Sequence, residues 1–117
     1  MINVTIWHNP RCSKSREAMS ILEENGCEKE IIKYLDSKPN VDEIKTVLKM
    51  LNLSARELMR TKEDIYKDLK LVDEKSEEKL IEAMSIHQKL IERPIIIKGD
   101  KAIIGRPTSR IAEFLKS

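Results

Sequence analysis

Cys12 is the residue of this 117-residue chain whose surroundings best suit chemistry. It lies between a predicted strand and a predicted helix, at or near the N-terminus of the helix. Free backbone N–H groups and the positive end of the helix dipole favour an anion there, and therefore a thiolate. Arg11, Lys14 and Arg16 add positive charge within four residues, and His8 lies four residues upstream. The pattern predicts a nucleophilic thiol; the alternative is a buried cysteine that acts as a small hydrophobic residue.

The second cysteine is badly placed to form a disulfide with the first. Ser15 stands where a thioredoxin-type Cys-x-x-Cys motif has its second cysteine, so the adjacent thiol is missing. Cys27 comes 15 residues after Cys12, past the other end of the predicted helix, which separates the two sulfurs by roughly 20 Å. A disulfide needs Cα atoms about 4.4–6.8 Å apart. We therefore interpret Cys27 as structural and expect an external thiol to resolve any oxidised adduct on Cys12.

Other sites that use a cysteine or bind a phosphate fit the sequence less well. A Cys-x5-Arg phosphate loop would need arginine six residues after Cys12, where Ala18 stands; Arg16 comes only four residues after it. No spacing of Cys, His, Asp and Glu is typical of a metal site, and no glycine-rich phosphate loop is present. We therefore expect neither a bound metal nor a bound cofactor.

The elements around Cys12 form a predicted β-α-β unit. Apolar and polar residues alternate from Ile2 to Trp7, which predicts a strand. Helical spacing follows from Cys12 to Asn25, and Gly26 stands where a left-handed helix cap belongs. A second short strand is predicted from Glu30 to Leu35. A parallel crossover of this kind is almost always right-handed.

The middle of the chain is predicted to be helical and its end to be a β-hairpin with a helix. Asn40 caps one predicted helix, Ser54 opens a short one that ends near Arg60, and Ser76 caps another. Strands follow at residues 94–98 and 101–104, and Pro107 suits the first position of a last helix. We predict a single domain, residues 1–117, with a thioredoxin-like α/β fold. Its small, mixed four-stranded sheet is flanked by helices, with a helical insertion at about residues 41–90 between the β-α-β and β-β-α halves.

The composition excludes several classes of protein. Hydrophobic residues make up 40% and charged residues 36%, which is typical of a folded soluble domain. The net charge of +2 does not indicate a nucleic-acid partner. No apolar run approaches the roughly 20 residues that span a bilayer, no signal-peptide pattern opens the chain, and two cysteines cannot make a disulfide-rich secreted module. We expect a cytoplasmic monomer without a membrane or nucleic-acid partner.

Four segments resemble the glutaredoxin-dependent arsenate reductases of the ArsC family. They are His8–Arg16 (HNPRCSKSR), Leu53–Arg60 (LSARELMR), Glu92–Ile97 (ERPIII) and Gly105–Pro107 (GRP). The segments occur in the order and spacing of the family and extend the resemblance over nearly the whole chain. The resemblance implies that the protein reduces arsenate to arsenite through an adduct on a cysteine thiolate, with glutathione as co-substrate and glutaredoxin as partner.

The resemblance also implies roles for single residues. It assigns the nucleophile to Cys12 and the binding of the oxyanion to Arg60, Arg93 and Arg106. A guanidinium group offers paired donors to a tetrahedral anion and keeps its charge. Pro94 matches the cis-proline that thioredoxin-like folds place opposite the active cysteine, so we predict a cis Arg93–Pro94 bond.

His8 and Ser15 match positions near the cysteine of the family. Both are expected to tune the thiolate or to form a hydrogen bond with it. The alternative for His8 is an ordinary polar residue of the loop.

Taken singly, the three arginines have more ordinary interpretations. Arg60 could be a favourable charge at a helix C-terminus, Arg93 a solvated residue before a strand, and Arg106 a residue of a turn. Their combination with Cys12 in the family spacing is what favours an anion site.

Two other functions stay open at the level of sequence. One is a different glutathione-linked thiol redox enzyme that acts on another anion. The other is a regulator like Spx, which shares this fold and binds RNA polymerase. Such regulators commonly carry Cys-x-x-Cys where this chain has Cys12 to Ser15, and they lack the Gly105–Pro107 segment, so both features favour the reductase.

Overall fold

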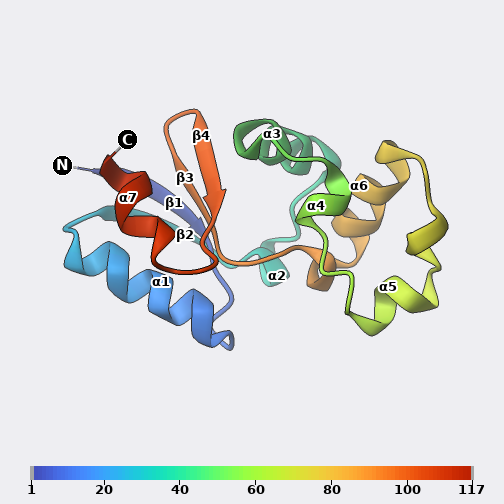
Figure 1. Ribbon diagram of the computed structural model, residues 1–117, viewed down its shortest axis with the longest axis horizontal. Coiled ribbons are helices and arrows are strands. Elements are labelled where there is room, and N and C mark those ends of the chain that lie inside the picture. Colours follow the sequence, from blue (N-terminus) through green and yellow to red (C-terminus); the bar gives the residue numbers. More distant parts are fainter. Residues whose placement is uncertain (1, 117) are drawn as a thin grey trace. The chain divides into compact units, whose positions relative to one another are not determined.

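A computed structural model describes residues 2–116, which form two compact units, residues 2–37 with 93–116 and residues 38–92 (Figure 1). The first unit contains β1 (Asn3–Trp7), α1 (Ser13–Glu24), β2 (Glu28–Ile32), α2 (Tyr34–Ser37), β3 (Ile95–Lys98), β4 (Lys101–Ile104) and α7 (Arg110–Lys116). The second contains α3 (Val41–Leu51), α4 (Ala55–Leu58), α5 (Asp64–Asp68), η1 (Leu71–Asp73), α6 (Glu77–Ile86) and η2 (Gln88–Leu90).

The strands of the first unit form a four-stranded mixed sheet in the order β2-β1-β3-β4. β1 runs parallel to β2 and antiparallel to β3, and β3 runs antiparallel to β4. The β-α-β half thus joins the β-β-α half through the pair β1 and β3. This arrangement confirms the predicted thioredoxin-like fold class and the predicted hairpin.

Helices α1 and α7 lie side by side against one face of this sheet (Figure 1). The residues that fill the space between them share an inward position on their strand or helix: Val4, Ile6, Ala18, Leu22, Ile96, Ile111 and Leu115. Every second residue of a strand and every third or fourth residue of a helix faces the same side, which is the pattern that predicted these elements. The packing fixes α1, and with it the position of Cys12.

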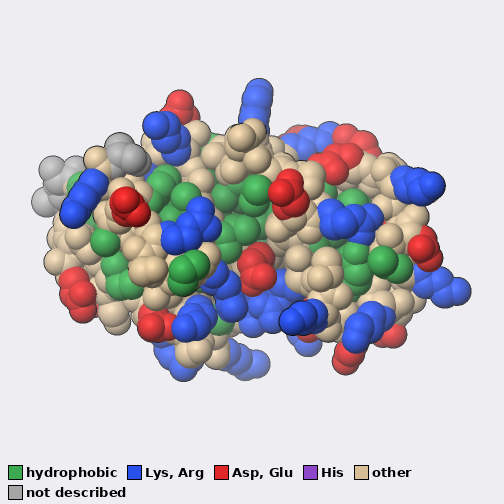
Figure 2. Space-filling model, in the orientation of Figure 1, with side chains coloured by type: hydrophobic (Ala, Val, Ile, Leu, Met, Phe, Trp, Pro, Cys, Tyr) green, Lys and Arg blue, Asp and Glu red, His purple; other side chains and the backbone are tan. Residues whose placement is uncertain are grey.

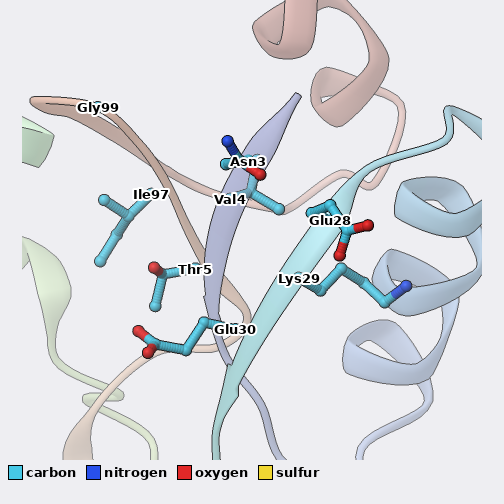
Figure 3. A pocket seen from close by; sticks show the side chains of 8 residues that line it. All are labelled: Asn3, Val4, Thr5, Glu28, Lys29, Glu30, Ile97 and Gly99. Atoms are coloured by element: carbon cyan, nitrogen blue, oxygen red, sulfur yellow. The ribbon is translucent and has the colours of Figure 1, made fainter. Parts of the chain in front are cut away.

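The opposite face of the sheet carries a shallow groove of about 410 Å³ (Figure 3). Thr5 of β1, Glu30 of β2 and Ile97 of β3 pair across neighbouring strands there, and Glu28 and Lys29 also line the groove. Glu28 and Glu30 bring carboxylates to this groove, whereas the ammonium group of Lys29 points toward α1 and pairs with Glu23 (Figure 3). The groove is therefore a poor place for an oxyanion. The groove contains none of the residues that the sequence analysis selects.

The second unit consists of helices with well-defined ends. Asn40 caps α3 with a capping box, in which its side chain accepts from the N–H of Glu43 at 2.8 Å. Ser54 forms the same arrangement with Glu57 at the start of α4. The Arg56 guanidinium donates to the hydroxyl of Tyr66 and to the carbonyls of Leu71 and Glu74, which ties the segment from α5 to η1 back onto α4.

The prediction of a second strand from Glu30 to Leu35 is wrong in its position. β2 begins at Glu28, because the left-handed Gly26 lets the N–H of Cys27 bond the carbonyl of Leu22 and sends the chain directly into the sheet. Residues 34–37 then form the helical turn α2. Its buried Tyr34 stacks on Trp7 with ring centroids 6.2 Å apart, so a strand would lose this contact.

Two predicted helix ends also differ from the structure. Pro107 does not open the last helix, because residues 105–109 form a loop and α7 begins at Arg110. The short helix α4 ends at Leu58 rather than near Arg60, because Met59 pairs with Ile91 in an isolated antiparallel bridge. Arg60 therefore follows an extended segment, and its interpretation as a charge at a helix C-terminus does not apply.

The surface mixes both signs of charge. On the face in Figure 2, Lys and Arg side chains alternate with Asp and Glu side chains, in keeping with a net charge of +2. Among residues 2–116, the helices are all too short or too polar to traverse a lipid bilayer.

We expect Leu22→Ala to lower the free energy of unfolding by about 2–5 kcal/mol, because the substitution leaves a cavity between α1 and the sheet. Leu22 is 0% exposed. Urea unfolding of the two proteins measures the difference. Ile86→Ala is the control, because Ile86 is 68% exposed and its truncation should cost less than about 0.5 kcal/mol. Equal losses in both variants would contradict the packing.

Candidate active site around Cys12

Three chain segments leave the sheet at the same edge and build the surroundings of Cys12. Trp7, at the end of β1, pairs with Ile95 at the start of β3, and Ile95 pairs with Ile104 at the end of β4. The loop before α1, the residues before β3 and the residues after β4 therefore lie together. These segments carry Cys12, Arg93 and Arg106, so the topology of the first unit gathers residues that are far apart in the sequence.

Cys12 is the N-cap residue of α1, with extended backbone angles, and its side chain is 8% exposed. Its carbonyl accepts from the N–H of Arg16 at 3.0 Å, which closes the first helical turn. The N–H groups of Lys14 and Ser15 point at the sulfur and form hydrogen bonds with it. The sulfur therefore occupies the position where a helix N-terminus binds an anion.

The pKa of Cys12 is lowered from its ordinary value, although burial by itself raises it. Hydrogen bonds from the N–H of Ser15, the side chain of Arg93 and the N–H of Lys14, with the charge of Arg93, outweigh the burial. A thiol whose pKa falls on folding stabilises the folded state at high pH, and this contribution is lost as the pH falls through the folded pKa. The site thus favours the thiolate, which is the nucleophilic form.

Arg106, which follows Cys12 by 94 residues in the sequence, also contacts the sulfur. Its Nη2 lies 3.5 Å from Cys12 Sγ, and its Nε donates to the carbonyl oxygen of Arg93 at 2.8 Å. The backbone of one arginine thus orients the guanidinium of the other. Arg110, the first residue of α7, donates to the carbonyls of Ile104 and Arg106 at 3.3 and 3.4 Å and holds the loop that carries Arg106.

The Arg93–Pro94 peptide bond is cis, as predicted, and the structure also has a cis Arg106–Pro107 bond that the sequence analysis did not anticipate. The two segments meet through the N–H of Gly105, which donates to the carbonyl of Pro94 at 2.8 Å. A side chain at Gly105 would place its Cβ 3.1 Å from Cγ of Pro94. A side chain there would require Pro94 or Ile111 to shift by a few tenths of an ångström, so glycine suits this close approach of the two arginine-bearing segments.

His8 and Ser15 form a buried pair beside Cys12. Nδ1 of His8 lies 2.7 Å from Oγ of Ser15, which also accepts from the N–H of Asn9 at 3.0 Å. The hydrogen bond from Ser15 to the thiolate comes from its backbone N–H, whereas its hydroxyl group serves the loop. Burial, followed by the charges of Lys33 and Arg16, lowers the pKa of His8, so the imidazole is held in its neutral form.

Asn9 is a residue of this loop that the sequence analysis did not select. Its Oδ1 accepts from the N–H of Arg11 at 3.0 Å, and its carbonyl accepts from the N–H of Cys12, also at 3.0 Å. These bonds set the turn that delivers Cys12 to the helix. The Asn-Pro pair is the sequence signal that could have identified the role, because asparagine side chains bond the backbone two residues further on.

Arg60 belongs to the second unit, where carboxylates flank it. Its Nε lies 3.3 Å from Oε1 of Glu63 and its Nη1 lies 3.2 Å from Oε1 of Glu92. Its own N–H donates to the carbonyl of Leu90 at 2.7 Å. These partners of Arg60 all belong to the second unit, so the second unit sets its position.

Cys27 is a free, buried thiol, as is Cys12. Burial raises the pKa of Cys27 more than the charges of Lys29 and Lys98 lower it. The pKa of Cys27 is therefore above that of an ordinary cysteine, whereas the pKa of Cys12 is below it. Helix α1 lies between them. Within residues 2–116, no group of three or more His, Cys, Asp and Glu side chains is arranged to hold a metal ion.

The arrangement defines a thioredoxin-like protein with one activated cysteine at a helix N-terminus and arginine side chains around it. Comparisons with known proteins give the same class. The family model described as the ArsC family matches residues 7–114, so the chain belongs to the ArsC family. This result confirms the resemblance in the sequence.

Individual relatives cover the chain almost completely. It is 51% identical over 114 residues to the uncharacterized protein YfgD of Escherichia coli strain K12, covering 96% of both chains. It is 45% identical over 117 residues to an arsenate reductase of Neisseria meningitidis serogroup B, covering 98% of this chain and all of the relative. The solved structure of an arsenate reductase from Vibrio cholerae superposes with a TM-score of 0.93 at 45% identity, covering 96% and 97% of the two chains.

We expect Arg93→Ala to raise the pKa of Cys12, because the substitution removes both a hydrogen bond and a positive charge from the thiolate. Thiolate absorbance against pH measures this in a Cys27→Ser background, where Cys12 alone titrates. Alkylation by iodoacetamide at neutral pH should slow in parallel. Arg11→Ala is the matched control, because the exposed Arg11 is not among the groups that lower this pKa. An unchanged titration in Arg93→Ala would contradict the assignment.

Gly105→Ala should lower the free energy of unfolding by about 1–3 kcal/mol, as overpacking of a filled site does, and raise the pKa of Cys12 by displacing both arginines. The added Cβ would also lie 3.2 Å from Cδ1 of Ile111. Chemical denaturation and thiol titration measure the two effects. Adding Ile111→Val removes that contact and should restore part of the lost stability. Full stability together with an unchanged pKa in Gly105→Ala would show that glycine is not required.

Proposed function

We propose that the protein reduces arsenate to arsenite, with Cys12 as nucleophile and Arg60, Arg93 and Arg106 as ligands of the oxyanion. The observation that carries the proposal is a buried thiolate bonded by a helix N-terminus and by Arg93, with Arg106 3.5 Å from the sulfur. The names of the relatives from Neisseria meningitidis and Vibrio cholerae supply the substrate.

The charges explain why the nucleophile and the arginines belong together. Arsenate is a tetrahedral dianion near neutral pH, and a thiolate that approaches it meets electrostatic repulsion. Guanidinium groups remove this repulsion because they bind the equatorial oxygens while they also hold the sulfur as an anion. Arg93 and Arg106 contact the sulfur before substrate binds, so they transfer their remaining donors to the incoming oxyanion.

The reaction proceeds in three balanced steps. The Cys12 thiolate attacks As(V) of the dianion; a sulfur–arsenic bond forms as the bond from arsenic to the protonated oxygen breaks, and hydroxide leaves. The glutathione thiolate then attacks the Cys12 sulfur; a disulfide forms, the sulfur–arsenic bond breaks, and its electron pair reduces As(V) to arsenite. Glutaredoxin finally takes the glutathionyl group in a thiol–disulfide exchange and restores the Cys12 thiolate.

External thiols are required because the chain offers no second thiol near Cys12. Ser15 occupies the neighbouring position on α1, and the free Cys27 follows the other end of the helix. His8 and Ser15 support the reaction by fixing the loop that presents Cys12. Pro94 supports it through the contact with Gly105 that joins the segments of Arg93 and Arg106.

Arsenate-dependent oxidation of NADPH, coupled through glutathione, glutathione reductase and glutaredoxin, tests this function. Cys12→Ser should abolish the activity. Arg93→Ala and Arg106→Ala should each lower kcat/KM by about 100- to 1,000-fold, the usual effect of removing a preorganised donor to a developing charge. Arg11→Ala serves as the control and should stay within a few-fold of the unmodified protein.

The same assay separates this function from its alternatives. Activity that persists in Cys12→Ser would exclude Cys12 as nucleophile. No activity in the folded, unmodified protein with working coupling enzymes would exclude arsenate as the substrate. Activity that does not depend on glutaredoxin would exclude the third step.

A further inference from the structure

Arg60 is held by two carboxylates of its own unit. Nε donates to Oε1 of Glu63 at 3.3 Å and Nη1 donates to Oε1 of Glu92 at 3.2 Å. The three side chains are 24%, 31% and 27% exposed, so water reaches all of them. One positive and two negative charges give this Arg60 cluster, defined as Arg60, Glu63 and Glu92, a net charge of −1.

The backbone imposes this arrangement. Met59 and Ile91 form an antiparallel bridge. One hydrogen bond lies on each side of it: Arg60 N–H donates to the carbonyl of Leu90 at 2.7 Å, and Glu92 N–H donates to the carbonyl of Leu58 at 2.9 Å. Residues on two bridged strands lie close enough for long side chains to meet diagonally. Arg60 and Glu92 are therefore neighbours by backbone pairing, and the chain passes directly from Glu92 to Arg93 in the first unit.

We propose that Glu92, together with Glu63, competes with the oxyanion for Arg60 and thereby sets the affinity of the protein for its anion. The inference rests on the proposed function only in taking an oxyanion as the ligand of Arg60. A guanidinium group binds a carboxylate and a tetrahedral oxyanion through the same N–H donors. A dianion must therefore displace the carboxylates or be repelled by them.

The geometry allows such an exchange. Partly exposed ion pairs at 3.2–3.3 Å contribute little stability, because water competes for both partners. Within residues 2–116, Nη2 of Arg60 makes no hydrogen bond, so this nitrogen keeps its donors for a first contact with an anion. The carboxylates hold Arg60 in place and are released as the anion binds.

The test measures the binding of arsenate by titration calorimetry in a Cys12→Ser background, where no turnover occurs. Glu92→Gln keeps an oxygen acceptor for Nη1 and removes only the charge. Its Kd for arsenate should fall by about 3- to 10-fold, because a neutral amide oxygen competes less strongly than a carboxylate for the donors of Arg60. Glu63→Gln should shift the Kd in the same direction.

Two controls separate competition for Arg60 from a general effect of charge. Glu78→Gln removes one negative charge from the same unit, where Glu78 pairs with Lys45 at 2.7 Å, and should leave the Kd unchanged. In an Arg60→Ala background, Glu92→Gln should no longer tighten binding, because the residue it competes for is absent.

Several outcomes would overturn the inference. An unchanged or higher Kd in Glu92→Gln would mean that the carboxylate only orients Arg60. Equal tightening in Glu78→Gln, or in the Arg60→Ala background, would mean a field effect without competition. Absence of arsenate binding in every variant would overturn the proposed function and the inference together. Tightening that depends on Arg60, in a protein without reductase activity, would support the inference and overturn only the reaction.

Discussion

Stabilisation of the thiolate form of Cys12, which lowers the pKa of this thiol, is the interaction that links the separate segments of the first unit. A buried thiol resists ionisation, so the protein must supply donors that outweigh the loss of water. Backbone N–H groups at the start of α1 supply part of this stabilisation, and they come from the local sequence. Arg93 supplies another part, and it belongs to the second of the two chain segments that form the unit. The antiparallel pairing of β1 with β3 brings the two together, so the lowered pKa of the thiol depends on the sheet topology.

Most other residues of the site position the sulfur and the arginines and take no part in the chemistry themselves. Asn9, His8 and Ser15 hold the loop that carries the sulfur, and Gly105 lets the segments of the two arginines approach. Apart from the backbone N–H of Ser15, which bonds the sulfur, these residues contact no reacting atom; they fix the loop and the segments that carry the two arginines. Neutral His8 fits this role, because a charged imidazole would face the cations Lys33 and Arg16. The site thus consists of a loop, a helix N-terminus and two arginine-bearing segments arranged around one sulfur atom.

The sequence was sufficient for those features that local patterns encode. Alternation in β1, the helical stripe of α1, the caps at Asn40 and Ser54 and the predicted hairpin strands all identify elements correctly. It failed where tertiary contacts decide: Tyr34 turns into α2 because it stacks on Trp7, and α4 stops early because Met59 pairs with Ile91. Cys12 could be chosen from charge and helix position alone. The arginines could not, because single arginines before a strand or in a loop are common, and the family pattern was needed to select them.

The groups that donate hydrogen bonds to the sulfur of Cys12 come from distant parts of the sequence, and this has a consequence while the chain is being synthesised. Cys12 and α1 (Ser13–Glu24) are made early, whereas Arg93 and Arg106 are made only after 92 and 105 residues. A chain that is still being made therefore carries a thiol without its guanidinium partners. The donors that lower the pKa of Cys12 are therefore complete only after Arg93 has been made, and the contact with Arg106 forms last. Until then the thiol lacks part of the stabilisation of its thiolate, which is the form that reacts with oxidants and alkylating agents.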